Sequence, residues 1–263
     1  NKSMNTTPAY FTGIDIGSTA SKTVVLKEGK IEDYFVLPTG WNGRETANAI
    51  LEQLKNRGYA DDMRCVATGY GRICVDYADK IVTEITCHGK GADYLFKENG
   101  TVIDIGGQDA KVISLGSNGQ MMNFVMNDKC AAGTGRFLDV MAGILQLDIG
   151  ELEKEAAKSE TAAKISSTCT VFAESEVISQ LANGAAREDV VAGICNSVAA
   201  RVAALAKRIG IKEEVFMSGG VAQNGGVRLA LERELGVPIH YSEFSQLMGA
   251  YGAALFAHIK ATK

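Results

Sequence analysis

The chain has 263 residues, and a hydrophobic share of 46% is large enough to build the cores of two folded lobes. A net charge of -4, with Lys and Arg scattered along the sequence, argues against a nucleic-acid partner, because such binding relies on clustered cations. The six cysteines lack the compact spacing of secreted domains, so we expect free thiols and a cytoplasmic protein.

The first part of the chain alternates short apolar runs with amphipathic stretches. Runs with a period of two predict strands, and apolar residues spaced by three or four predict helices. We therefore expect strands at residues 10–16, 22–27, 30–37 and 64–68, and helices at 43–57 and 83–96.

The second part repeats this order and adds helices. Three strands, a helix, a strand and a helix thus occur twice, which predicts an α/β protein of two βββαβα lobes with a nucleotide cleft between them. We place the lobes at residues 1–98 and 99–263. The second lobe is expected to contain strands at 102–105, 110–115, 121–126, 215–218 and 239, and helices at 134–146, 149–158, 170–181, 187–209, 227–235 and 246–259.

Residues 190–211 form the most apolar long stretch of the sequence. Arg201, Lys207 and Arg208 interrupt this stretch at helical spacing, and such charges are unfavourable inside a membrane. We therefore expect a buried or amphipathic helix here and no membrane partner.

Two segments of the chain repeat one another at a constant offset. Gly13–Leu26 matches Val102–Leu115, so that Asp15 corresponds to Asp104. Each copy reads as an apolar strand, an Asp, a tight turn of small residues and a second strand, which is typical of a β-hairpin. Because duplication over a dozen positions is rarely accidental, the two hairpins are expected to share a role.

The repeated hairpins have the chemistry of a polyphosphate clamp. Gly17 and Gly106 allow close approach of the backbone, so that consecutive N–H groups can point at phosphate oxygens. The carboxylates of Asp15 and Asp104 can hold a hydrated Mg²⁺ ion. The pair therefore predicts a site for a nucleotide and Mg²⁺.

A third glycine turn follows the expected strand at 215–218. The segment Ser218–Asn224 places small residues where a base or ribose can pack, with a helix N-terminus that can face phosphate. The alternative is an ordinary turn between a strand and a helix. Its position after a duplicated phosphate clamp favours the nucleotide site.

Four blocks of the sequence resemble one family, the ATP-dependent activators of 2-hydroxyacyl-CoA dehydratases. This family is part of the superfamily of actin, sugar kinases and heat-shock chaperones, so the resemblance implies actin-like (ribonuclease H-like) lobes. It covers nearly the whole chain, and its two cysteine-containing blocks are the most specific. The blocks are Asp15–Lys22, Asp104–Asp109, Asn127–Phe137 and Ser166–Val177.

The resemblance implies which residues contact the nucleotide. Asp15, Asp104 and Gln108 would be catalytic, with Gln108 orienting the attacking water, although this side chain could instead only satisfy its turn. The residues around the phosphates of ATP or ADP would be Ser18, Thr19, Ala20, Ser21 and Lys22 of the first hairpin and Gly106, Gly107, Gln108 and Asp109 of the second. The residues beside the adenosine would be Gly219, Gly220 and Asn224, together with Gln246 of the last helix.

Cys130 and Cys169 stand apart from the other cysteines. Each precedes an expected helix, and Cys169 also follows the cap-type residues Ser166–Thr168, so we expect both sulfurs at helix N-termini, where the helix dipole favours a thiolate. A 4Fe-4S cluster needs about four thiolates, which predicts a homodimer with one shared cluster, as the resemblance also implies. The other cysteines are expected to be small buried hydrophobic residues: Cys65, Cys74, Cys87 and Cys195.

Together these features predict an ATP-dependent one-electron reductase. Hydrolysis of ATP would drive an electron from the cluster to an iron–sulfur partner, which the resemblance names as a 2-hydroxyacyl-CoA dehydratase or a related reductase, with ferredoxin or flavodoxin as the donor. Two alternatives remain open, a small-molecule kinase with Asp104 as its base and a nucleotide-driven assembly protein. Neither alternative needs the two cysteine blocks.

Overall fold

The computed structural model describes residues 7–96, 99–166, 169–211 and 214–261. Its contacts divide the chain into two compact units. The first unit contains residues 1–98, 116–121 and 247–263, and the second contains residues 99–115 and 122–246. Each unit is built on one five-stranded sheet.

The first sheet is formed by β1 (Tyr10–Ile16), β2 (Ala20–Lys27), β3 (Lys30–Pro38), β4 (Met63–Thr68) and β5 (Lys80–Ile81). Its strand order is β3-β2-β1-β4-β5, with β1 antiparallel to β2 and parallel to β4. The first four strands confirm the prediction. The strand β5 was not predicted, because two residues are too few to show a period of two.

One face of the first sheet is covered by α1 (Gly43–Asn56), which begins after the N-cap residue Asn42. Ile50 of this helix shares a hydrophobic core with Ile14 and Ile16 of β1. Ile14 and Ile16 lie on the same face of β1, because side chains alternate along a strand, and this is the face that α1 covers.

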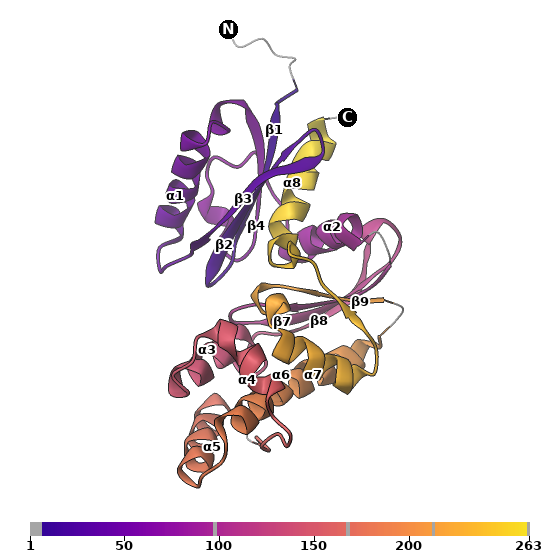
Figure 1. The fold of residues 1–263 in the computed structure, drawn as a ribbon. Coiled ribbons are helices and arrows are strands. Elements are labelled where there is room, and N and C mark those ends of the chain that lie inside the picture. Colours follow the sequence, from indigo (N-terminus) through magenta and orange to yellow (C-terminus); the bar gives the residue numbers. More distant parts are fainter. Residues whose placement is uncertain (1–6, 97–98, 167–168, 212–213, 262–263) are drawn as a thin grey trace. The chain divides into compact units, whose positions relative to one another are not determined.

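The opposite face of β1 carries α8 (Met248–Ala261), and Figure 1 shows the two helices on opposite sides of the strands. Gly13 makes this close packing possible, since a Cβ there would overlap the backbone of Ala250. A further helix, α2 (Glu84–Phe96), packs against α8.

The second sheet repeats the first. It consists of β6 (Gly100–Ile105), β7 (Ala110–Leu115), β8 (Met121–Asn127), β9 (Glu214–Ser218) and β10 (Ile239–His240), in the order β10-β9-β6-β7-β8. Like β1, the central strand β6 is antiparallel to the next strand in sequence and parallel to a later one. The same order and directions in both sheets confirm the predicted duplication.

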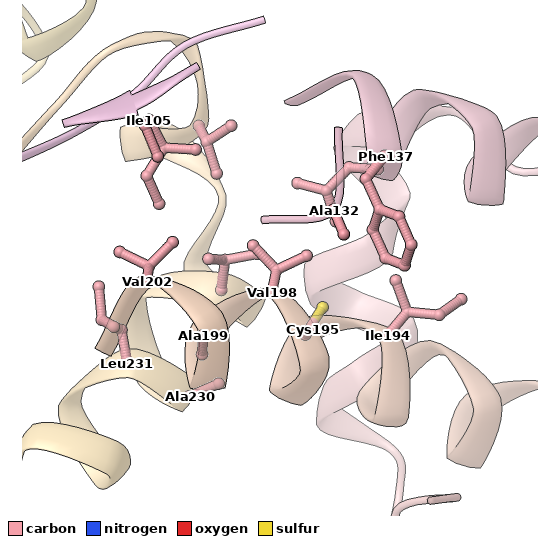
Figure 2. Packing of buried hydrophobic residues seen from close by; sticks show 14 of the residues in the cluster. Ile105, Ala132, Phe137, Ile194, Cys195, Val198, Ala199, Val202, Ala230 and Leu231 are labelled. Carbon is pink, nitrogen blue, oxygen red and sulfur yellow. The ribbon is translucent and has the colours of Figure 1, made fainter. Parts of the chain in front are cut away.

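Five α-helices lie within the described residues of the second unit, and the longest of them, α6 (Arg187–Ile209), forms the centre of its core. Figure 2 shows Val202 of this helix below Ile105, Val198 nearer to Ala132, and Ile194 below Phe137. The helix therefore connects the sheet to the helix that contains Phe137. The five helices are α3 (Gly135–Ile144), α4 (Leu152–Ala157), α5 (Thr170–Ala182), α6 (Arg187–Ile209) and α7 (Gly225–Leu235).

The length and composition of α6 would also allow it to span a membrane. However, 67% of its most apolar window is buried within the structure. Burial against other helices explains why this helix is so apolar, and the prediction of a buried helix is confirmed.

The last helix lies in the first unit, whereas the sequence analysis assigned residues 99–263 to the second lobe. The physical reason is the fit of α8 against β1 at Gly13 and against α2, where a Cβ at Gly252 would overlap the backbone of Cys87. Sequence periodicity indicates a helix here, but it does not indicate the sheet on which the helix packs. The division into lobes 1–98 and 99–263 stays a prediction.

Candidate functional site

The two repeated segments form hairpins with the same register. β1 and β2 pair Asp15 with Lys22, and β6 and β7 pair Asp104 with Lys111. Both carboxyl residues are buried, with 4% and 2% of their surface exposed. Two hairpins with an acid near each turn are therefore confirmed.

The turns of the two hairpins are also closed in the same way. The Gly17 N–H donates to the Ala20 carbonyl at 3.1 Å, and the Gly106 N–H donates to the Asp109 carbonyl at 2.9 Å. The tips of both turns thus have matching backbone geometry but different side chains.

The strand next to each hairpin repeats a second feature of the site. β4 is parallel to β1 and places Thr68 opposite Asp15, while β9 is parallel to β6 and places Ser218 opposite Asp104. A hydroxyl residue therefore ends the neighbouring strand beside each acid.

Each hydroxyl residue is followed by a glycine in the left-handed region, Gly69 at φ +89° and Gly219 at φ +84°. A Cβ at either position would press on the carboxylate of the adjacent acid, Asp15 or Asp104, and on a strand carbonyl. Glycine is therefore required at both positions. Gly219 was predicted to belong to the site, whereas its counterpart Gly69 was not.

Thr39 supports the first hairpin and was missed from the sequence. Its hydroxyl donates to the Gly17 carbonyl at 2.7 Å and lies 2.7 Å from the Ser21 hydroxyl, and its N–H donates to the Thr19 carbonyl at 2.9 Å. Ser21 is buried in this contact, whereas Ser18 is half-buried and Thr19 is exposed. A single threonine at the end of a strand gives no signal that it holds a turn.

The acid of the second hairpin is held by a buried network. Ser218 Oγ donates to Asp104 Oδ1 at 2.8 Å, and Lys111 Nζ lies 3.6 Å from Asp104 Oδ2. The same ammonium lies 3.0 Å from both carboxylate oxygens of Asp109. The Lys111 side chain is only 3% exposed, so the carboxylates surround its charge inside the protein.

The corresponding lysine of the first hairpin has different surroundings. Ala20 occupies the place that Asp109 has in the second copy, and Lys22 makes no ion pair within the described part of the chain. A Cβ at Gly17 would lie 3.1 Å from Lys22 Nζ, which puts this ammonium beside the turn. The charge of Lys22 is therefore available to an anionic ligand.

Gln108 lies at the tip of the second turn and is exposed. Among the residues that the structure describes, its side chain makes no hydrogen bond. The alternative in which Gln108 only satisfies its own turn therefore has no support, and its role toward water stays a prediction.

The third glycine turn is tied to the segment before the last helix. The Gly219 N–H donates to the Ser245 carbonyl at 3.3 Å. Gln246 belongs to a short 3-10 turn, Ser245–Leu247, and not to the last helix, where the sequence analysis placed it. A Cβ at Gly220 would meet no atom within 4 Å, so the surface there is open.

Asn224 is the N-cap residue of α7, and its side chain accepts a hydrogen bond from the Val227 N–H at 3.3 Å. The start of this helix is not open to phosphate, contrary to expectation, because the Gly225 N–H donates to the Glu153 carboxylate at 3.3 Å. A carboxylate of α4 thus already supplies the negative charge that a helix N-terminus favours.

The second hairpin is connected to α3 through the backbone. The Gly135 and Arg136 N–H groups, at the start of α3, donate to the carbonyls of Gly106 and Gly107, both at 2.8 Å. A Cβ at Gly135 would lie 3.2 Å from the Gly106 carbonyl oxygen, so the close approach favours glycine. This junction joins the proposed phosphate turn to the chain segment that follows Cys130.

Cys130 lies in a loop before α3 and is not its cap residue, which corrects the prediction that its sulfur lies at the helix N-terminus. Thr134 is the N-cap residue, and its N–H donates to the Ala131 carbonyl at 3.1 Å. Gly133, at φ +86°, reverses the chain between the cysteine and the helix. This turn was not recognised from the sequence.

A cavity of about 440 Å³ adjoins the Cys130 loop and α6. Lys129, Arg201 and Arg208 place positive charge on its wall, and Asp128 contributes an acid.

Cys169 is the N-cap residue of α5, as predicted, and it is exposed. Ser167 and Thr168, which were expected to help cap this helix, lie outside the described residues. The sulfur of Cys169 therefore lies at the exposed N-terminus of α5.

Two side chains of α5 hold the segment that leads to Cys169. The Ser166 N–H donates to the Glu176 carboxylate at 3.0 Å, and Gln180 Nε2 donates to the Lys164 carbonyl at 2.8 Å. The resemblance covers Glu176, but its spacing from Ser166 gave no sign of this contact.

The remaining cysteines differ from this pair in burial. Cys74 is half-buried beside Gly43 and departs from the expected burial. The other three are buried as expected, and burial raises the pKa of each thiol, to about 12 in the last two: Cys65, Cys87 and Cys195.

These differences predict the order of alkylation of the iron-free protein. Iodoacetamide should label Cys169 first, because it is exposed, and the half-buried Cys130 and Cys74 more slowly. The three buried thiols should react only after unfolding in guanidinium, where all six cysteines are labelled. Mass spectrometry of peptides over time measures the order. Labelling of Cys195 in the folded protein as fast as Cys169 would contradict the structure.

Comparison with known proteins agrees with this geometry. Residues 12–257 match the profile of the BadF/BadG/BcrA/BcrD ATPase family. The chain is 54% identical over 260 residues to the (R)-2-hydroxyglutaryl-CoA dehydratase activating ATPase of Acidaminococcus fermentans, covering 97% of this chain and 99% of the relative. It is 52% identical over 253 residues to the 2-hydroxyisocaproyl-CoA dehydratase activator of Clostridioides difficile, covering 94% of each.

A solved structure shares the fold over almost the same length. The activator of the 2-hydroxyisocaproyl-CoA dehydratase from Clostridium difficile, with bound ADPNP, superposes with a TM-score of 0.91 at 50% identity and covers 96% of each chain. This match and the repeated sheet order confirm the predicted class of duplicated actin-like lobes. The chain therefore belongs to the BadF/BadG/BcrA/BcrD ATPase family.

Proposed function

We propose that this chain is an ATP-dependent one-electron reductase that activates a partner enzyme. It hydrolyses ATP and delivers a low-potential electron to an iron–sulfur 2-hydroxyacyl-CoA dehydratase or a related reductase, with ferredoxin or flavodoxin as the electron donor. The names of two relatives that match nearly the whole chain, both dehydratase activators, support this choice of partner.

The observation that carries the proposal is the junction between the second hairpin and α3. The hydrogen bonds of Gly135 and Arg136 attach α3 to the turn at Gly106 and Gly107. A movement of this turn when phosphate binds or leaves is therefore passed through a short loop to Cys130. An electron carrier controlled by a nucleotide needs such a connection.

The first hairpin binds the phosphates in this proposal. Its turn presents backbone N–H groups and the side chains of Ser18 and Thr19, and Lys22 adds a positive charge that no carboxylate of the described residues neutralises. Ala20 and Ser21 complete the segment, with Ser21 supporting the turn from inside.

The acids and Gln108 serve hydrolysis. Asp15 and Asp104 are hard oxygen ligands that suit Mg²⁺, which when bound would neutralise charge on the phosphates. The exposed amide of Gln108 can accept from a water molecule and donate to phosphate, and so it can orient an in-line attack. Gly106, Gly107 and Asp109 shape the turn that presents this amide.

The adenosine lies beside the third turn in this proposal. Asn224 Nδ2 is buried and makes no hydrogen bond among the described residues, so it is a donor available to a ligand. The open surface at Gly220 leaves room for a flat group. The proposed neighbours of the adenosine are Gly219, Gly220, Asn224 and Gln246.

The cysteines fit a cluster that two copies of the chain share. Cys130 is half-buried and Cys169 is exposed. A 4Fe-4S cluster, which supplies a one-electron redox centre, needs about four cysteine ligands, and two copies of the chain would provide them. The helix after Cys169 also exposes Val171, Phe172 and Ile178 by 66%, 68% and 50%. Apolar side chains so exposed favour a protein contact, and a homodimer would cover them.

Coupling requires that ATP and ADP bind two states of the protein with different affinities. A ligand shifts an equilibrium only by this difference, and a tenfold preference corresponds to about 1.4 kcal/mol. The hydrogen bonds of Gly135 and Arg136 couple the turn at Gly106 and Gly107 to α3 within one unit, so that the difference in affinity can change the position of the cysteine loop.

The cluster proposal predicts the iron content of cysteine variants. The anaerobically purified protein should contain about four iron and four sulfide ions per dimer. Cys130→Ala and Cys169→Ala should each lose this iron and still bind ATP, because neither residue belongs to a hairpin. Iron and sulfide analysis with ATP titration measures both properties.

Cys74→Ala is the matched control, since this half-buried thiol lies outside both cysteine blocks and should retain full iron. A wild-type protein that is monomeric and free of iron after anaerobic reconstitution would rule out the shared cluster.

The proposed coupling predicts how nucleotides affect electron transfer. When the reduced protein is mixed with a purified 2-hydroxyacyl-CoA dehydratase, MgATP should accelerate reduction of the partner at least about tenfold over MgADP. Stopped-flow absorbance of the partner's iron–sulfur centre measures the rate. Equal rates with MgATP, with MgADP and without nucleotide would contradict the coupling.

A further inference from the structure

We propose that Lys111 is a positioning residue for ATP hydrolysis. Its ammonium group, held by Asp109, fixes the carboxylate of Asp104 in the orientation that the reaction requires. This inference rests on the ATP hydrolysis of the proposed function, but it does not depend on electron transfer.

The surroundings of Lys111 exclude a direct role in binding phosphate. Its side chain is 3% exposed, and its ammonium contacts both oxygens of Asp109 at 3.0 Å and faces Asp104 Oδ2 at 3.6 Å. A buried ammonium lowers the stability of the fold unless carboxylates pair with it. Moving this ammonium toward a ligand would leave Asp104 and Asp109 without their cation. Lys111 therefore acts through Asp104 and not on the nucleotide.

Both oxygens of Asp104 are constrained by this arrangement. Ser218 Oγ donates to Oδ1 at 2.8 Å, and Lys111 lies on the side of Oδ2. Contacts to two different oxygens restrict rotation of the carboxylate group. Supporting contacts of this kind orient carboxylates that hold metal ions in other proteins.

The two hairpins differ in the residue two positions before the lysine. Both copies keep the lysine opposite the acid, but the first has Ala20 where the second has Asp109. Lys22 is consequently half-buried beside its turn, whereas Lys111 is enclosed. The same backbone thus presents one lysine to a ligand and uses the other as an internal support.

Asp109 also links the network to the turn. Its carbonyl accepts the Gly106 N–H at 2.9 Å, and it directly follows Gln108 in sequence. The pair of Asp109 and Lys111 therefore sets Asp104 relative to the turn that carries Gln108. Loss of Lys111 should disturb hydrolysis more than nucleotide binding.

The test compares steady-state ATP hydrolysis by the anaerobically purified wild type and Lys111→Met. We expect kcat to fall about 10- to 100-fold, as for other residues that orient a metal-binding carboxylate. The KM for ATP should change by less than about threefold, because Lys111 does not contact phosphate. Lys22→Met should show the opposite pattern, and the exposed Lys207→Met serves as the unaffected control.

A double variant separates positioning from stability. Lys111→Met leaves two buried or half-buried acids without their cation and can lower the unfolding temperature, whereas Lys111→Met with Asp109→Asn removes one charge of each sign. The double variant should recover part of the lost unfolding temperature, because only Asp104 then lacks its cation, but it should not recover kcat. Recovery of both, or a single variant with unchanged kcat, would overturn the positioning role.

Binding of fluorescent ADP with and without Mg²⁺ gives a readout independent of turnover. Lys111→Met should require a higher Mg²⁺ concentration to reach the full affinity for ADP, while saturating Mg²⁺ restores that affinity and the Mg²⁺-independent part is unchanged. An unchanged dependence on Mg²⁺ would overturn the proposal. A wild type that hydrolyses ATP without reducing a dehydratase would refute the proposed electron transfer alone, and the variants would still decide the role of Lys111.

Discussion

Two backbone hydrogen bonds, from Gly135 and Arg136 to the carbonyls of Gly106 and Gly107, join the second hairpin to the helix that follows Cys130. They connect the proposed phosphate turn, inside the second unit, with the start of the helix that follows the loop of a proposed cluster ligand. This close approach favours glycine at position 135, because a Cβ there would lie 3.2 Å from the carbonyl oxygen of Gly106. The core around α6 keeps both partners in place, as Figure 2 shows for Ile105 and Ala132.

The duplication supplies two equivalent scaffolds that have diverged in their side chains. In each unit a parallel neighbouring strand brings a hydroxyl residue and a left-handed glycine against the buried acid. The difference lies at Ala20 and Asp109, which leaves one lysine available to a ligand and encloses the other. In the proposed function, binding and hydrolysis are divided between two copies of one structure, while Cys130 and Cys169 occur only in the second copy.

The sequence predicted the features that periodicity and repetition encode. Alternating apolar residues and matched Asp positions were sufficient for both hairpins, and Thr170 after Cys169 was sufficient for the start of α5. Long-range packing was not predictable in this way. Gly13 allows α8 to pack closely on β1, and the Glu153 carboxylate accepts a hydrogen bond at the start of α7. The cap position of Cys130 was wrong because the turn at Gly133 depends on one positive φ, and glycine is compatible with many other conformations.

The central claim is that nucleotide state reaches the cysteine loop through Gly135. The most direct measurement is the EPR spectrum of the reduced protein with MgADP and with a non-hydrolysable ATP analogue. The wild type should give two different spectra, and Gly135→Ala should bind both nucleotides but give nearly the same spectrum with each. Gly143→Ala in the same helix, where a Cβ meets no atom within 4 Å, should behave as wild type. A full spectral difference in Gly135→Ala would contradict the claim.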